Sequence, residues 1–346
     1  MKKSFTILLI LAVLIPLSWF IGSCTRFDRT EPLDYVTLDI PDGFPAPVQD
    51  FAGNRFSREG IELGRRLFYD GILSKDGNYP CSSCHQQIAG FGTFEHDRSH
   101  GYNNSHTLRN APVLFNLAWQ DKFHWDGAFS SLREEAAQPI TGQIEMAETF
   151  ENVIRKLKND GAYRIMFRRV FQTADIRAEH IQKALEQFTG SLISANSKYD
   201  KFKRGEINFT SDEQAGYVLF QQHCASCHPE PLFTDYSYRN IGLPVDNFLN
   251  DYGKMMVTGL SSDSLKFKVP TLRNVDISSN YMHDGRFNTI QQVLNHYRSG
   301  IQQSPTLEPA LIGGISLTTT EAGQMIRFLR TLTDSSFLIN PALSRP

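Results

Sequence analysis

Two short motifs place cysteine and histidine at a spacing that can hold a haem covalently. They read Cys81-Ser82-Ser83-Cys84-His85 and Cys224-Ala225-Ser226-Cys227-His228. Two thiols three positions apart can reach the two vinyl groups of a porphyrin, and the next histidine then lies under the iron. We therefore expect two haems c, with Cys81, Cys84, Cys224 and Cys227 as thioether anchors and His85 and His228 as proximal iron ligands.

Zinc binding and thiol redox chemistry are the alternatives for a CxxCH motif. Zinc would require both motifs to converge on one four-thiolate site, and both histidines would then have no role. The chain has five cysteines, and the fifth, Cys24, ends an N-terminal apolar segment. No cysteine is left for a structural disulfide or a catalytic thiol.

The N-terminus has the features of an export signal. Lys2 and Lys3 precede a mostly apolar run over residues 5–20, and Ile21-Gly22-Ser23-Cys24 follows. This pattern resembles the lipobox of bacterial lipoproteins, with residues 1–23 as the signal peptide and Cys24 as the lipidated residue. A plain signal peptide and an uncleaved transmembrane anchor are the alternatives. All three interpretations place the globular part on the periplasmic side of a bacterial membrane.

Composition and periodicity indicate a mainly α protein with long loops. The chain has 346 residues, of which 40% are hydrophobic and 21% charged, and its formal net charge is −2. This composition is ordinary for a globular protein, and the absence of a basic stripe argues against nucleic-acid binding. Residues 24–50 are rich in Pro and Asp and suggest a tether. Capped amphipathic segments predict helices at 57–69, 149–171 (broken near 160–161), 177–203, 210–222, 289–299 and 320–332.

The two haem motifs lie in a repeated series of landmarks. The first half has Leu-Phe at 67–68, CxxCH at 81–85, Thr-Leu-Arg-Asn at 107–110 and Trp-Asp-Gly at 125–127. In the second half, Leu-Phe is at 219–220, CxxCH at 224–228, Thr-Leu-Arg-Asn at 271–274 and His-Asp-Gly at 283–285. The same order twice predicts two cytochrome c-like domains related by internal duplication, at 51–205 and 206–346. The helix at 177–203 would connect them.

The ligand on the far side of each haem iron decides its chemistry. Two strong protein ligands give an electron carrier, whereas an open face with an acid–base group nearby gives peroxide or oxygen chemistry. Composition alone does not identify these ligands. The candidates are His96, His100 and His106 after the first motif, and Met255, Met282 and Tyr297 after the second.

Longer segments of the chain resemble the bacterial di-haem cytochrome c peroxidase family, which includes the MauG-type enzymes. The similarity runs from about Leu63 to Phe337 and is carried by LGRRLFYDGILSKDGNYPCSSCH, LRNAPVLFN, FHWDG, QPITGQIEM, FKVPTLRNV and YMHDGRFNT. It implies an N-terminal haem, on His85, where peroxide reacts. It also implies a C-terminal haem, on His228, that receives or stores electrons.

The resemblance also implies roles for single residues. Trp125 matches the tryptophan between the haems, Glu145 the distal acid–base glutamate, and Asn110 a side chain of a bound calcium ion. Without the resemblance, Trp125 is an ordinary core residue and Glu145 a solvated loop carboxylate. Glu135 stands where a glutamine is usual, and a second carboxylate near Glu145 would raise the pKa of one of the two.

Further departures from the family pattern affect the iron ligands. Tyr102 occupies the place of the distal histidine of peroxidases that need reductive activation, so an open first haem is expected, with ligation by His100 or His106 as the alternative. Tyr297 stands where a methionine ligates the second haem in typical peroxidases. MauG-type enzymes also have a tyrosine at this position. Met282 remains an alternative ligand. A phenolate favours ferric and higher states. At the calcium site, Ser278 and Asn280 replace the usual Thr and Pro.

These features lead to one expected function and two alternatives. The first is a peroxidase that reduces hydrogen peroxide to water with electrons from a periplasmic one-electron donor, a small cytochrome c or a cupredoxin. The second is a MauG-type oxidase that stores high-valent iron and oxidises a protein or small partner through Trp125. The third is a di-haem electron carrier without enzymatic activity. The resemblance also implies a homodimer.

Overall fold

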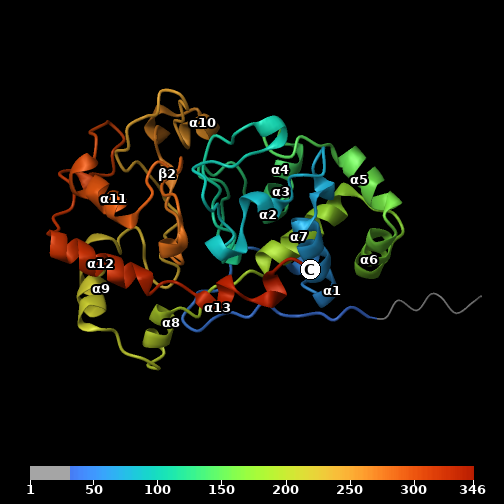
Figure 1. Cartoon of the computed structure of the whole chain (residues 1–346), viewed down its shortest axis with the longest axis horizontal. Helices are drawn as coiled ribbons and strands as arrows, with labels where there is room; N and C mark the ends of the chain where they lie inside the picture. Colours follow the sequence, from blue (N-terminus) through green and yellow to red (C-terminus); the bar gives the residue numbers. More distant parts are fainter. Residues whose placement is uncertain (1–31) are drawn as a thin grey trace, which may run out of the picture. The chain divides into compact units, whose positions relative to one another are not determined.

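Short helices joined by long loops build the chain in the computed structural model (Figure 1). The structure describes residues 32–346, so the expected signal peptide and Cys24 lie outside the described residues. Residues Asp34–Pro346 form one unit. Within the described part of the chain, no helix is both long and apolar enough to cross a membrane.

The mainly α fold class expected from the sequence is confirmed. Two-residue strands β1 (Tyr238–Arg239) and β2 (Phe267–Lys268) pair antiparallel. The helices are α1 (Arg58–Tyr69), α2 (Cys81–Cys84), α3 (Leu132–Glu135), α4 (Gln138–Thr141), α5 (Phe150–Asn159), α6 (Gly161–Phe171), α7 (Ala178–Gly190), α8 (Lys198–Lys203), α9 (Ser211–His223), α10 (Met255–Thr258), α11 (Ile290–Asn295), α12 (Thr319–Arg330) and α13 (Ser335–Leu338).

Each haem motif follows a helix that crosses a partner helix closely. Helix α1 packs on α7, and α9 packs on α12. A Cβ at Gly64 of α1 would lie 2.0 Å from the carbonyl oxygen of Ala184, and a Cβ at Gly216 of α9 would lie 2.0 Å from that of Gln324. Only glycine permits this approach. Both glycines precede the Leu-Phe landmark by three positions, so the repeated sequence encodes a repeated helix crossing.

Side-chain caps set the ends of the predicted helices. Ser57, Thr149 and Thr210 accept hydrogen bonds from backbone N–H groups in the first turns of α1, α5 and α9. Asp160 both follows α5 and caps α6, which confirms the predicted break. Such caps satisfy donors that a helix leaves unpaired.

The long helix predicted at 177–203 is wrong, because the segment 191–197 interrupts it. The structure has α7 ending at Gly190 and α8 beginning at Lys198. In between, the N–H of Ser194 donates to the side chain of Asn116, and the N–H groups of Ala195 and Asn196 donate to Asp334. Tertiary side chains thus replace the helical carbonyls as acceptors.

The duplication is visible in backbone geometry, with one correction to the landmark pairing. Asn116 and Asn274 are both left-handed, with φ of 57°, whereas Asn110 is not among the left-handed residues. The loops that follow close with equivalent bridges, Phe123 to Phe129 and Tyr281 to Phe287. Residues 111–129 therefore correspond to 269–287 at a constant offset. The sequence-based match of Asn110 with Asn274 is wrong, because identical letters occur six residues before the equivalent turn.

Two large hydrophobic clusters and a smaller one around Ala118, Trp119 and Leu232 form the interior of the described chain. The first large cluster contains residues between Leu63 and Leu192 together with Phe337, and the second contains residues between Tyr199 and Leu332. The domain boundary expected at 205/206 stays a prediction.

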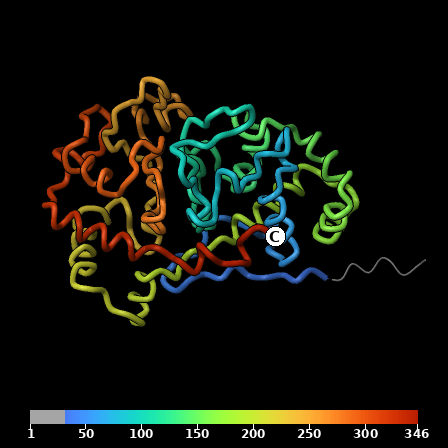
Figure 2. The backbone as a smooth tube through the Cα atoms, in the orientation of Figure 1, coloured from blue at the N-terminus to red at the C-terminus, as the bar shows by residue number. Residues whose placement is uncertain are grey.

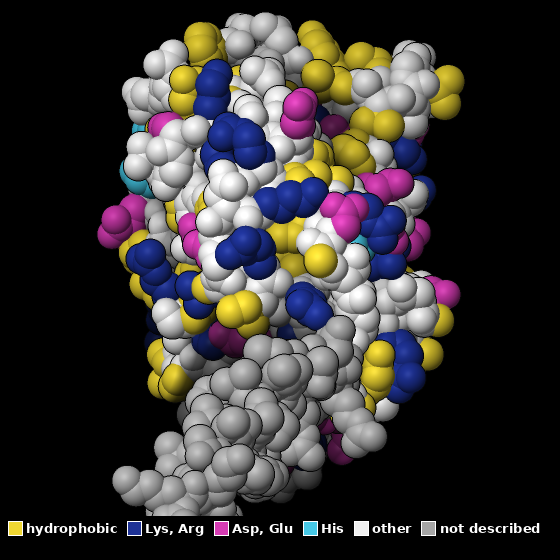
Figure 3. Space-filling model, turned by 90° about the vertical axis from the view of Figure 1, so that its right-hand side faces the viewer, with side chains coloured by type: hydrophobic (Ala, Val, Ile, Leu, Met, Phe, Trp, Pro, Cys, Tyr) yellow, Lys and Arg dark blue, Asp and Glu magenta, His cyan; other side chains and the backbone are white. Residues whose placement is uncertain are grey.

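Both ends of the described chain are fastened to the first half. The C-terminal segment returns to α1 (Figure 2), where Arg65 and Tyr69 donate to the carbonyls of Ser344 and Leu343 at 2.9 Å. In the expected tether, Val48 donates to the carbonyl of Ala118, and Pro45 accepts from the Trp119 indole at 2.7 Å. This part of the segment is packed against the first half. On the face in Figure 3, basic side chains are interspersed with apolar and acidic ones.

Candidate functional site

The first CxxCH motif lies at a short helix that brings its thiols to one side. Cys81–Cys84 form α2, and the N–H of His85 donates to the carbonyl of Cys81 at 2.9 Å. The ring Nδ1 of His85 is 2.8 Å from the carbonyl oxygen of Phe91. A carbonyl only accepts, so Nδ1 carries the proton and Nε2 keeps the lone pair that an iron ion needs.

The second motif repeats this arrangement. Helix α9 ends at His223 and leads directly into Cys224. Nδ1 of His228 is 3.0 Å from the carbonyl oxygen of Phe233, which fixes the same tautomer. Burial lowers the pKa of His85 and of His228, so both rings favour the neutral form that binds metal.

Glu145 lies in a tight loop beside the first motif. Its backbone N–H donates to the carbonyl of Gly142 at 3.0 Å, and a Cβ at Gly142 would lie 2.3 Å from the carboxylate oxygen Oε2. Burial raises the pKa of Glu145, and the nearby charge of Glu135 raises it further. The expected effect of a second carboxylate is confirmed in direction, although burial is the larger cause.

Glu135 has a partner that the sequence reading did not consider. His124 Nε2 lies 3.2 Å from Glu135 Oε1. His124 precedes Trp125 in the FHWDG segment and has a left-handed backbone, with φ of 63°. Its equivalent in the second half is Met282, which is also left-handed, with φ of 74°. The place of His124 directly before Trp-Asp-Gly is therefore the sequence signal that could have identified it.

Both carboxylates lie near the first haem motif. The pKa of the Cys81 thiol is raised to about 12, mainly by burial, and the charges of Glu135 and Glu145 contribute to the rise. Burial is also the main cause of the raised pKa of the Cys84 thiol, and the charge of Glu145 adds to the rise. The structure therefore brings Glu135, Glu145 and His124 together around the haem that His85 would ligate.

The loop with the distal candidates packs directly on Glu145. The N–H of Tyr102 donates to the carbonyl of Glu145 at 2.6 Å. The His100 ring is partly buried and contacts His106 and His96, with ring centroids 4.2 Å and 4.9 Å apart, while His96 and His106 are exposed. Ligation by His100 or His106 stays a prediction.

Trp125 lies where the two halves meet. Its indole N–H donates to the carbonyl of Asn110 at 2.9 Å, and its own carbonyl accepts from the N–H of Lys268 at 2.7 Å. The next residue, Asp126, binds Arg109 at 2.5 Å, and Arg109 also binds Asp251 through Nε at 2.6 Å. These contacts fix the tryptophan between the two haem motifs.

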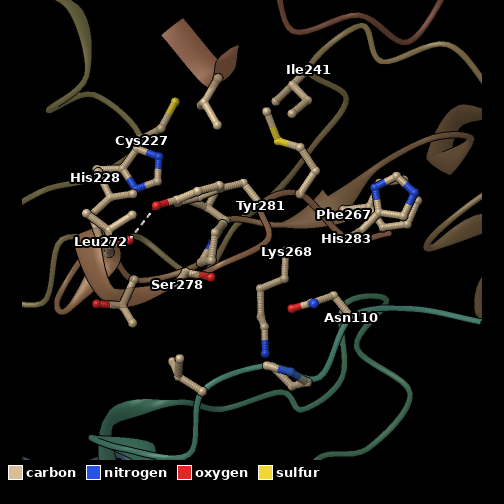
Figure 4. Close-up of a pocket in the computed structure, with 18 of the residues that line it drawn as sticks. Asn110, Cys227, His228, Ile241, Phe267, Lys268, Leu272, Ser278, Tyr281 and His283 are labelled. Carbon is tan, nitrogen blue, oxygen red and sulfur yellow. Dashed lines mark hydrogen bonds between the residues drawn. The ribbon is translucent and has the colours of Figure 1, made fainter. Parts of the chain in front are cut away.

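The second motif opens onto a cavity of about 280 Å³. Cys224, Cys227, His228, Met282 and Tyr297 all line it, as does Trp125. Figure 4 shows Cys227 and His228 on one side of the cavity, with the Tyr281 side chain running across it toward them.

Tyr297 lies within the predicted helix but two residues beyond the end of the observed α11. The predicted helix at 289–299 is α11 only to Asn295, and Tyr297 belongs to a π-helical turn, His296–Gly300. Burial raises the pKa of Tyr297, and the charges of Cys224 and Cys227 add to the rise. Two thiols, a neutral imidazole and a phenol around one cavity fit a haem c. The choice between Tyr297 and Met282 as sixth ligand stays a prediction.

Asn110, the residue expected at a calcium site, lies at the junction of the two halves. Its side-chain N–H donates to the carbonyl of Asp97, and its backbone N–H donates to the carbonyl of His283, both at 2.8 Å. Ser278 donates to the carbonyl of Asn280 nearby at 2.6 Å. Among the described residues, no group of three or more His, Cys, Asp or Glu could hold a metal ion. A calcium ion here would rely on carbonyl and amide oxygens.

Known proteins share this sequence and this architecture. The family model for di-haem cytochrome c peroxidase matches residues 58–208. The methylamine utilization protein MauG of Methylorubrum extorquens is 32% identical over 90% of this chain and 88% of its own length. The cytochrome c551 peroxidase of Nitrosomonas europaea is 34% identical over 79% of each chain.

A solved structure supports the same relationship. It is that of a MauG-like protein associated with microbial copper homeostasis. The two chains superpose with a TM-score of 0.84 at 29% identity, over 90% of this chain and 99% of that one. Two haem motifs, the repeated helix crossing and these relatives agree: this chain belongs to the di-haem cytochrome c peroxidase family, which includes MauG.

Proposed function

We propose that this protein reduces hydrogen peroxide to water at the haem on His85, with electrons relayed from the haem on His228. The observation that carries the proposal is the Glu145 carboxylate, which lies beside the first haem motif with a raised pKa and has Glu135 and His124 as neighbours. Relatives named cytochrome c peroxidase support it.

The acid–base work falls to Glu145. The bound haem supplies the iron centre that takes up peroxide and delivers electrons to it. Cleavage of the O–O bond needs a proton moved from the near oxygen to the leaving oxygen. A carboxylate can take the proton from the first and return it to the second when its pKa lies closer to neutrality than that of a free glutamate. Burial gives Glu145 this property.

Trp125 connects the two haem sites in this proposal. The hydrogen bond from its indole to Asn110 fixes the ring plane, and the backbone bond from Lys268 ties it to the second half. A fixed aromatic ring between the sites provides a path for single electrons. Both reducing equivalents can then reach the first site without release of radicals.

Replacing Glu145 by Gln tests the function. We expect Glu145→Gln to retain both haems and to lose ~10²–10⁴-fold in peroxide turnover, the range for general acid–base groups. The exposed Glu134, one residue before Glu135, provides the matched control, and Glu134→Gln should keep parental turnover. Parental turnover in Glu145→Gln would refute the assignment.

A MauG-type oxidase is the second candidate, and Tyr297 is the observation that favours it. Tyr297 lines the cavity of His228, and a phenolate ligand would favour ferric and higher iron states over a role in accepting electrons. In that case the second haem would share oxidising equivalents with the first and act on a protein or small partner through Trp125.

The proposal also covers the cellular location of the protein, its electron donor, a calcium ion and the oligomeric state. We propose that the chain is exported and lipidated at Cys24, and that a periplasmic small cytochrome c or cupredoxin donates electrons. A calcium ion at Asn110, bound through oxygens at the junction of the halves, and a homodimer are further parts of it. Chelation followed by elemental analysis tests the calcium ion, and sedimentation tests the dimer.

A further inference from the structure

Lys268 is a buried lysine on β2 that the proposed reaction does not use. It is 7% exposed and lines the same cavity as His228 and Trp125. Its backbone N–H donates to the carbonyl of Trp125 at 2.7 Å, and its ammonium donates to the carbonyl of Lys122 at 3.0 Å. In Figure 4 the side chain extends from the second half toward the ribbon that bears Asn110.

The other strong cations of this cavity already have carboxylate partners. Among the described residues, the lysines and arginines that line it are Arg239, Lys268 and Arg273. Arg239 pairs with Asp235 and Glu308, both at 2.9 Å. Arg273 pairs with Asp200 through two hydrogen bonds, at 2.9 Å and 2.8 Å. No carboxylate of the described chain forms an ion pair with Lys268.

An ammonium in this position is costly without an anion. Burial lowers the pKa of Lys268 to about 7, and the charges of Glu135, Asp121 and Asp126 only partly oppose the fall. Buried charges in proteins are normally paired. The second haem motif lines this cavity, and a haem carries two propionate carboxylates, so the missing anion belongs to the haem held by that motif.

We propose that Lys268 is the counter-ion of a propionate of the haem on His228 and thereby holds that edge of the haem against Trp125. The backbone bond between Lys268 and Trp125 joins the counter-ion to the aromatic residue in one rigid unit. Lys268 is therefore a positioning residue for the electron path. The inference rests on haem binding alone and not on the proposed peroxide reaction.

Reduction potentials of the two haems test the proposal. A nearby cation stabilises the ferrous form, so Lys268→Met should lower the midpoint potential of the haem on His228. We expect about a tenfold shift in the equilibrium constant for its reduction, which is ~59 mV for one electron. Lys268→Arg keeps the charge and should stay near the parental value. The propionate bending band in the resonance Raman spectrum should shift in Lys268→Met.

Three comparisons separate this role from a packing role. Lys266→Met removes a lysine two residues earlier that pairs with Asp263 at 3.5 Å, and it should leave both potentials unchanged. Met is chosen as the replacement because it is apolar and long enough to fill the buried space. Haem content is measured in every variant. Equal shifts in Lys268→Met and Lys268→Arg, a shift only at the haem on His85, or no shift at all would overturn the proposal. None of these readings uses peroxide, so loss of the peroxidase proposal would leave them intact.

Discussion

Three ionisable side chains around the first haem motif influence one another. Glu135 raises the pKa of Glu145, and His124 lowers it, although burial outweighs both. His124 also contacts Glu135 directly at 3.2 Å. The proton affinity of Glu145 is therefore set by burial together with the charges of Glu135 and His124.

Removing His124 should shift the pH dependence of turnover. His124→Asn is suitable because asparagine tolerates the left-handed backbone at this position. Without the histidine, the influence that lowers the pKa of Glu145 is lost and Glu135 loses its partner. The acid limb of the profile of kcat/KM against pH should therefore move upward, since that limb reports the base of the free enzyme. An acid limb that stays or moves downward would contradict the coupling.

The ligand at the second haem separates the peroxidase from the MauG-type oxidase. Tyr297→Met replaces a phenol by a thioether, which stabilises ferrous iron and raises the potential of that haem. We expect a changed optical and EPR spectrum for the haem on His228 and an unchanged one for the haem on His85. Met282→Leu is the matched control, because Met282 lines the same cavity. If Met282→Leu alters the spectrum and Tyr297→Met does not, Met282 is the ligand.

Local motifs identify some of these residues, and tertiary contacts identify the others. The CxxCH spacing specifies cysteine and histidine positions because the porphyrin itself fixes that spacing. His124 and Lys268 have no such local signature. Their significance comes from Glu135 and from Trp125, which lie in separate loops, and a single sequence does not report those distances.

At the scale of elements, an ion cluster joins the loop of Trp125 to the second half. Arg109 donates to Asp126 and, through two nitrogens, to Asp251 at 2.6 Å and 2.8 Å. Burial alone would raise the pKa of Asp251, but the hydrogen bonds and charge of Arg109 outweigh it and lower the pKa. The cluster thus stabilises the contact between the halves at the point where Trp125 lies.

Breaking the cluster should weaken the fold and the relay together. Asp251→Asn is expected to cost roughly 3 kcal/mol at neutral pH, the low end for a buried pair, because Asp126 still binds Arg109. The folded-state pKa of Asp251 is lowered, so its stabilisation is present above the unfolded value and is lost as pH falls. Urea unfolding at pH 7 and near pH 3 should therefore show a gap between parent and variant that narrows below about pH 4.

A second buried pair provides the control. Asp200 binds Arg273 with similar geometry, but among the described residues neither forms an ion pair or hydrogen bond with Trp125, Asp126 or Asp251. Asp200→Asn should also destabilise the protein. Only Asp251→Asn should slow electron transfer between the haems in a rapid-mixing experiment. Equal slowing in both variants would mean that the cluster has no special relation to Trp125.

The elements that sequence patterns predicted well are those with local causes. Helices α1, α5 and α9 begin at side-chain caps and bury one face, and both signals are local. The segment 191–197 escaped prediction because Asn116 and Asp334, both distant in sequence, bind its backbone. The sequence-based pairing of the two halves was displaced by six residues in one landmark for a similar reason. Two Thr-Leu-Arg-Asn segments match by letter, whereas the backbone turn is shared by Asn116 and Asn274.

At the scale of the whole molecule, two similar halves have acquired different chemistry at equivalent places. Trp125 and His283 occupy the same position of the repeated loop, as do His124 and Met282. The first half uses this loop to approach Glu135 and the second half. In the second half, His283 stacks on Phe267 at 3.6 Å, and burial lowers its pKa to about 4. One loop geometry therefore serves a polar cluster in one half and a neutral packed ring in the other.

The proposed attachment of the molecule to a membrane depends on Cys24, which precedes both haem motifs in the sequence. We propose lipidation at Cys24, while the globular part begins near Asp34 and binds its haems from Cys81 onward. Cys24→Ser should therefore leave haem content and peroxide turnover unchanged and move the protein from the membrane fraction to the soluble periplasmic fraction. The parent should begin at Cys24 and carry lipid by intact mass, because lipobox cleavage precedes that cysteine. A Cys24→Ser protein that stays in the membrane and begins at Met1 would instead indicate an uncleaved anchor.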